Sequence, residues 1–158
     1  MSGELHSDCA RVRDTLKRLA MPAKDIYHET VKNALLKDGW MITHDPLVLR
    51  WGTTDVYVDL GAEQLLAAEK HGQKIAVEIK SFVGRSNVDD LEKALGQYLL
   101  YHDILTQREP DRILYLAVHE GVWLGIFAEP IGKLLLDNQR IKLLVFDRQA
   151  EVIMRWIP

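Results

Sequence analysis

The sequence predicts an α/β fold, a mixed central sheet flanked by helices in the order helix, three strands, helix, strand, and then a further helix and strands. Apolar residues recur at helical spacing in 24–38 and in 88–105. Short β-rich runs separated by turn residues fill the interval between them. Two later runs, 113–118 and 143–146, are apolar on both faces, as central strands covered by helices are.

Length and composition favour one globular domain. The chain has 158 residues, 47% of them hydrophobic and 27% charged, which is enough for a substantial core. The formal net charge of -3 gives no bulk attraction to nucleic acid. A polyanion would therefore have to be held by a local basic patch or by bound metal.

The ends and the cysteine count favour a cytoplasmic protein. The lone Cys9 excludes an internal disulfide, and the opening Met1-Ser2-Gly3-Glu4 carries acid where a secretory signal carries base. No apolar run approaches the roughly 20 residues of a membrane helix. Residues 1–20 are separated from the rest by Met21-Pro22-Ala23, so we expect an N-terminal extension before a single domain at 21–158.

The first half of the domain contains one helix and several strands. Gly39 follows the helical pattern of 24–38 in the position favoured after a helix C-terminus. Residues 40–43 and 47–51 favour extended structure around an Asp45-Pro46 break, and 52–54 form a turn before a strand at 55–59. Residues 65–69 fit helix or strand. The turn residues at 71–73 favour a hairpin that returns into a strand at 75–80.

The second half alternates helices and strands. Ser86 predicts the N-terminus of the helix that continues through 88–105, and mid-helix Gly96 suggests close approach of that helix to the sheet. Pro130 suits the first turn of a helix through 134–136. Residues 152–156 predict an edge strand after the central strands.

The strand 75–80 carries the main candidate site. Side chains alternate along a strand, so Glu78 and Lys80 share a face and present both charges at one edge of the sheet. Strand pairing would bring Asp59 beside Glu78. With the backbone carbonyl of Ile79, these carboxylates would form a Mg²⁺ or Mn²⁺ site, and Lys80 would orient or help deprotonate an attacking water. The alternative without a catalytic role is a surface salt bridge between Glu78 and Lys80.

Other residues extend or replace parts of this site. Asp55 or Glu63 would replace Asp59 if the strand register differs, because a slip of one residue changes the face of every side chain. Glu29 is a further candidate metal ligand, although solvent exposure explains it equally well. Gln97 and Tyr101, four apart on a helix, could both reach a substrate phosphate or a metal-bound water.

Zinc is disfavoured because the six histidines have no cysteine partners and no His-x-x-x-His spacing. His28, beside Glu29, is the histidine nearest to the candidate ligands in sequence. The four tryptophans are better explained as core and hairpin anchors than as platforms for stacked bases.

The arrangement of Asp59, Glu78-x-Lys80 and Gln97-x-x-x-Tyr101 resembles the PD-(D/E)xK nuclease superfamily, whose core is restriction-endonuclease-like. From about Met21 to Pro158 the chain also resembles the XisH family. The phrases that carry this resemblance are Ala23-Lys24-Asp25, Lys37-Asp38-Gly39-Trp40, Thr43-His44-Asp45-Pro46, Tyr57-Val58-Asp59-Leu60-Gly61-Ala62-Glu63, Ala94-Leu95-Gly96-Gln97-Tyr98 and Leu114-Tyr115-Leu116-Ala117-Val118. Val58 stands where the superfamily has a proline, and residues 1–20 lie outside the family pattern.

The resemblance implies a controlling factor for excision of the fdxN DNA element, acting with a companion called XisI. Two functions are compatible with it. One is a metal-dependent DNA endonuclease or resolvase-like protein that uses Asp59, Glu78 and Lys80. The other is a catalytically silent accessory that binds XisI or a recombinase, which the net negative charge favours. Self-association stays open in both cases.

Overall fold

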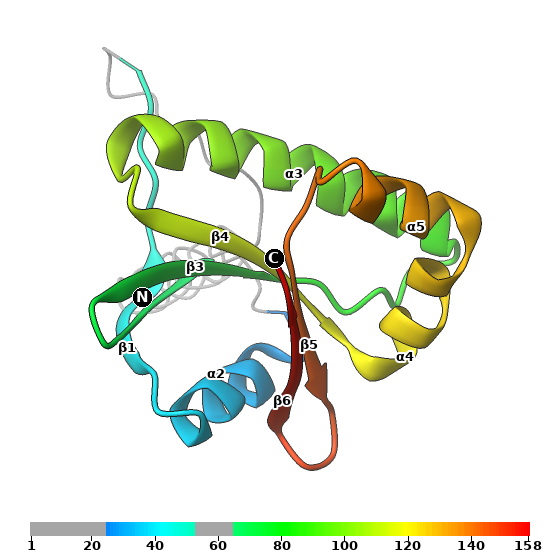
Figure 1. Cartoon of the computed structure of the whole chain (residues 1–158), viewed down its shortest axis with the longest axis horizontal. Helices are drawn as coiled ribbons and strands as arrows, with labels where there is room; N and C mark the ends of the chain where they lie inside the picture. Colours follow the sequence, from blue (N-terminus) through cyan, green and yellow to red (C-terminus); the bar gives the residue numbers. More distant parts are fainter. Residues whose placement is uncertain (1–24, 53–64) are drawn as a thin grey trace, which may run out of the picture.

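The computed structural model describes residues 25–52 and 65–158. Within these ranges, the strands form one mixed six-stranded sheet in the order β1-β2-β3-β4-β5-β6. Helix α2 covers one face, and α3 and α5 cover the other (Figure 1). The predicted order of helix, three strands, helix and strand is confirmed by the elements α2, β1 to β3, α3 and β4. The predicted extension at 1–20 and the predicted strand at 55–59 lie outside the described residues.

Helix α2 (His28–Lys37) packs Val31 and Leu35 against the sheet, where both side chains are fully buried. Gly39 then adopts a φ of +87°, a left-handed conformation that glycine reaches without steric cost. This reversal directs the chain into β1 (Met41–Leu47). The predicted helix is confirmed, although its regular turns begin four residues later than the pattern indicated.

Strand β1 differs from its prediction. It continues through Asp45-Pro46 instead of breaking there, and residues 48–51 lie outside the strand. Leu47 lies opposite Leu65, where the described part of the chain resumes, and this is the last described pair of the ladder. Val48 is 61% exposed outside it.

The ambiguous segment at 65–69 is a strand. β2 (Leu65–Lys70) and β3 (Gln73–Ile79) form an antiparallel hairpin with Leu66 opposite Val77. Its two-residue turn has positive φ at His71 (49°) and Gly72 (79°). Two successive residues with positive φ match the twist of the flanking strands. The predicted hairpin is therefore confirmed.

Helix α3 (Asn87–Arg108) crosses between β3 and β4 (Arg112–His119). The Ser86 hydroxyl caps it by accepting a hydrogen bond from the backbone N–H of Asp89 at 3.3 Å. Its buried face comprises Leu91, Ala94, Tyr98, Tyr101, Ile104 and Leu105. The expected close approach at Gly96 is wrong, because a Cβ at this position would meet only open space.

The remaining elements complete the sheet. They are α4 (Glu120–Leu124), the 3-10 turn η1 (Ile126–Ala128), α5 (Pro130–Asp137), β5 (Leu143–Asp147) and β6 (Val152–Ile157). Strands β3, β4 and β5 are parallel, and β6 is antiparallel to β5. The crossovers through α3 and α5 lie on the same face of the sheet (Figure 1). Because β3, β4 and β5 are parallel, their carboxyl ends lie at the same end of the sheet.

Candidate functional site

Glu78 lies on the face of β3 that is covered by α3. Ala76, two residues earlier, packs in the cluster that contains Leu91 and Ala94 of α3, whereas Val77 and Ile79 pack on the α2 face. The predicted alternation is thus confirmed. The expected position at an edge of the sheet is wrong, because β3 is hydrogen-bonded to both β2 and β4. Glu78 is only 1% exposed, so a carboxyl group lies within the core.

Lys80 stands immediately beyond β3, at its carboxyl end. The backbone N–H of Lys80 donates a hydrogen bond to the carbonyl of Ala117 at 3.1 Å, which extends the pairing with β4 by one residue. Its side chain is half-buried. The backbone of Ile79 therefore runs between a buried carboxyl group and a partly accessible amine, the arrangement expected for Glu78-x-Lys80.

Gln97 and Tyr101 lie on the side of α3 that faces the sheet. Tyr101 is 4% exposed within the core cluster, and Gln97 is half-buried with its side-chain oxygen shielded from solvent. This oxygen accepts no hydrogen bond from the residues that the structure describes. A buried acceptor without a donor costs free energy, so a ligand donor at this position would be favourable.

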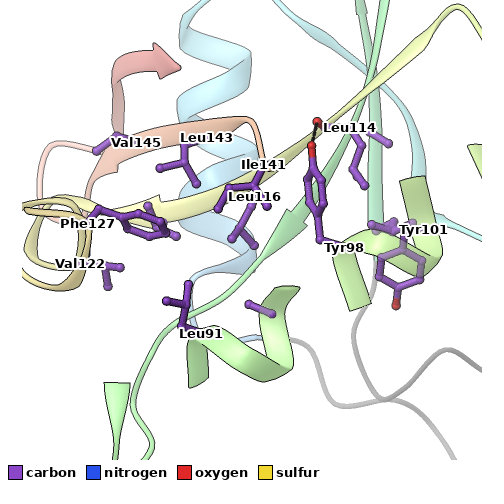
Figure 2. Packing of buried hydrophobic residues seen from close by; sticks show 14 of the residues in the cluster. Leu91, Tyr98, Tyr101, Leu114, Leu116, Val122, Phe127, Ile141, Leu143 and Val145 are labelled. Carbon is purple, nitrogen blue, oxygen red and sulfur yellow. Dashed lines mark hydrogen bonds between the residues drawn. The ribbon is translucent and has the colours of Figure 1, made fainter. Parts of the chain in front are cut away.

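Tyr98 is a neighbour of Glu78 that sequence reasoning treated only as core. Its hydroxyl donates to the carbonyl of Leu114 at 3.0 Å and accepts from the backbone N–H of Lys142 at 3.1 Å. Figure 2 shows the Tyr98 hydroxyl at the Leu114 carbonyl, while the Tyr101 hydroxyl points the other way. Burial, supported by the nearby Glu78 charge, raises the pKa of Tyr98 to about 12.

The second predicted carboxylate, Asp59, lies outside the described residues, as do its alternatives Asp55 and Glu63. The described chain resumes at Leu65, and the pairing of Leu66 with Val77 sets the start of β2 beside Glu78. The pairing of Asp59 with Glu78 therefore stays a prediction.

Glu29 belongs to a different group of side chains. His28 Nε2 lies 2.8 Å from Asp45 Oδ1, and Lys32 Nζ lies 2.8 Å from Asp45 Oδ2. A carboxylate oxygen of Glu29 lies within 4.8 Å of the His28 and Asp45 ligand atoms. This group joins α2 to β1 on the α2 side, whereas Glu78 faces α3. His28 is only 2% exposed, so its contact with Asp45 also helps to pack α2 against β1.

Asp25 is a further residue that sequence reasoning missed. One of its carboxylate oxygens accepts from the backbone N–H of Tyr27 at 2.9 Å, and the other from that of Ser81 at 3.0 Å. Because Ser81 follows Lys80, Asp25 fixes the beginning of α2 against the carboxyl end of β3. No sequence pattern signals a contact between segments that are 56 residues apart.

The comparison with protein families decides the kinship of this fold. The model of the XisH protein family matches residues 21–154. The chain belongs to the XisH family. The resemblance seen in the sequence is therefore confirmed, whereas kinship with the PD-(D/E)xK superfamily stays a prediction.

Two solved structures support membership of the XisH family. An XisH family protein from Nostoc punctiforme PCC 73102 is 40% identical, with a TM-score of 0.76 over 85% of this chain and 100% of that chain. An fdxN element excision controlling factor protein from Anabaena variabilis is 43% identical, with a TM-score of 0.75 over 85% of this chain and 99% of that chain. No curated protein gives a match. Among the described residues, no helix combines the length and apolar character needed to cross a membrane.

Proposed function

We propose that this protein acts in the excision of a DNA element as a metal-dependent DNA endonuclease or resolvase-like protein. The single observation that carries the proposal is the burial of Glu78, at 1% exposure, one residue before the end of β3, where the half-buried Lys80 follows. Burying a carboxylate costs several kcal/mol unless other groups compensate. Buried titratable groups cluster at functional sites, where the chemistry requires them. The related Anabaena variabilis protein is described as controlling excision of the fdxN element.

The donor set fits a hard divalent cation. The carboxylates of Glu78 and Asp59, with the backbone carbonyl of Ile79, would hold Mg²⁺ or Mn²⁺, which prefer oxygen ligands. The bound ion would supply charge neutralisation at the phosphate. Lys80 would orient the attacking water and offset the negative charge that develops at phosphorus. Gln97 would accept a hydrogen bond from a metal-bound water through its side-chain oxygen or donate its N–H₂ to a phosphate oxygen, and Tyr101 would support the helix face beside it.

Partners follow from this proposal. DNA is the substrate, and an XisI-like companion or a recombinase would supply the sequence recognition that a net charge of -3 does not favour. The same net charge favours the second candidate, a catalytically silent accessory that binds such a partner. The two candidates differ in whether purified protein cuts DNA.

The test is cleavage of branched, nicked and single-stranded DNA in Mg²⁺ or Mn²⁺. We expect cleavage that a chelator abolishes and that Glu78→Gln, which keeps the side-chain volume, reduces at least 100-fold. Glu92→Gln is the matched control, because Glu92 is exposed on α3. Equal cutting by wild type and Glu78→Gln would contradict the assignment. If no substrate is cut while the companion still binds, the accessory function holds.

A further inference from the structure

A pocket of about 210 Å³ lies at the carboxyl ends of the parallel strands. Phe82 follows β3, His119 ends β4, Arg148 follows β5, and Asn87 opens α3; all four line this pocket, together with Gly121. We call it the carboxyl-end pocket. The register of β3 and β4 also sets Ser81, the residue after Lys80, opposite His119.

The guanidinium of Arg148 is held in a fixed orientation. Its Nε donates to Glu120 Oε1 at 2.9 Å, and the backbone N–H of Arg148 donates to Glu120 Oε2 at 3.2 Å. The Tyr27 side chain also lies close to this arginine. A fixed guanidinium loses little side-chain entropy on binding, and its planar array of donors matches a phosphate.

Gly121 leaves space between the arginine and the histidine. A Cβ at Gly121 would stand 3.3 Å from Arg148 Nη2 and 2.9 Å from His119 Cε1, so any larger residue would crowd both. The backbone N–H of Gly121 donates to His119 Nδ1 at 3.0 Å. Burial and the Arg148 charge lower the pKa of His119, so the imidazole is neutral at pH 7.

One further feature favours a bound anion. Asn87 presents an amide in the first turn of α3, a helix of 22 residues whose N-terminus carries partial positive charge. The acidic groups near the pocket include Glu120, which is paired with Arg148, and Asp25, which accepts from two backbone N–H groups. Asp89 and Asp90 lie in the first turn of α3, where Asp90 accepts from the backbone N–H of Gly84 at 2.9 Å.

We propose that the carboxyl-end pocket binds one phosphate group, and that in DNA this is a backbone phosphate near the bond positioned at Glu78 and Lys80. The DNA part rests on the proposed function. Arg148 is the cationic donor, and Asn87 adds a neutral donor. Free phosphate or a nucleotide would present the same chemistry.

The first experiment measures binding of a fluorescent oligonucleotide by anisotropy at several salt concentrations, in Ca²⁺ to prevent cleavage. Arg148→Gln should weaken binding about tenfold and lower the slope of log K against log salt by about one. Arg140→Gln is the matched control, since Arg140 is exposed and precedes the amino end of the same strand, β5. Equal affinity and slope for the two variants would overturn the proposal.

Asn87→Asp provides a second variant that should not impair folding. An added carboxylate in the first turn of α3 favours the helix but repels a phosphate, so thermal stability should hold while DNA affinity falls severalfold. In a parallel titration with inorganic phosphate, wild type should show NMR shifts at the Gly121 and Asn87 amides, and Arg148→Gln should not. Phosphate shifts without DNA binding would assign the pocket to a free phosphate or nucleotide.

These outcomes are separable from those of the proposed function. A protein that binds DNA through Arg148 but never cuts it leaves the pocket intact and refutes the nuclease. If the protein cuts DNA through Glu78 but Arg148→Gln binds DNA as wild type does, only the phosphate-binding role of the carboxyl-end pocket is refuted.

Discussion

The carboxylate of Asp25 accepts a hydrogen bond from the backbone N–H of Ser81 at 3.0 Å, joining the beginning of α2 to the end of β3. The contact places α2 beside the residue that follows Lys80. It also satisfies a backbone donor at a point where β3 has left the ladder.

We therefore expect Asp25→Ala to lower the free energy of unfolding by about 1 to 3 kcal/mol, because two backbone N–H groups lose their acceptor. Asp25→Asn keeps one side-chain oxygen and should lose less. Urea denaturation measures both variants. An Asp25→Ala protein as stable as wild type would show that water replaces the carboxylate at no cost.

Tyr98 should make stability depend on pH in the alkaline range. Its pKa rises from 10 to about 12 on folding, so the contribution is full below pH 10 and is lost as the pH rises through 12. The two-unit shift corresponds to about 3 kcal/mol. Tyr98→Phe should be less stable at pH 8 and should lose less stability between pH 10 and 12. If the assignment is wrong, denaturant titrations across this pH range would show wild type and Tyr98→Phe losing stability in parallel.

Asp45 should contribute in the acid range. Burial alone would raise its pKa, but the hydrogen bond from Lys32 and the charge of His28 outweigh burial and hold the pKa below its usual 3.8. The contribution is therefore present above pH 3.8 and is lost as the pH falls through the lower folded value. In acid denaturation Asp45→Asn should lose less stability over this interval than wild type. Asp103→Asn, an exposed site on α3, is the control.

Two glycines should respond oppositely to alanine. Gly96→Ala should raise the free energy of unfolding by about 1 kcal/mol, since its Cβ meets open space in a helix. Gly132→Ala should lower it by about 1 to 3 kcal/mol, because its Cβ would lie 2.3 Å from the Ile126 carbonyl oxygen. Thermal melts of the pair provide the comparison, and a stable Gly132→Ala would show that η1 can shift.

Much of the fold was predictable because local patterns carried it. Gly39 after a helical repeat, turn residues His71-Gly72 and the Ser86 cap each act over a few residues, and each prediction was confirmed. The failures concerned pairing at a distance. The continuation of β1 through Asp45-Pro46 depends on its pairing with β2, and the open space at Gly96 depends on how α3 is rotated over the sheet. Neither property is encoded within its own segment.

The candidate site divides in the same way. Alternation predicted that Glu78 and Lys80 share a face, but it could not predict that β3 is an interior strand or that Glu78 is buried. Asp25 and Arg148 escaped prediction because their partners lie far along the chain. The group of His28, Glu29 and Asp45 shows the same limit: sequence linked Glu29 to Glu78, while the structure sets it beside Asp45.

The two-residue turn between β2 and β3 has a consequence for how the family can vary. β3 is paired with a strand on each side, so its register is fixed. A longer turn would only extend into solvent and leave that register unchanged. One extra residue inside β3, however, would place an aliphatic neighbour beneath α3 where Glu78 now lies. Insertions and deletions in relatives that retain this acidic group should therefore fall at the tip and not between Ile75 and Ile79.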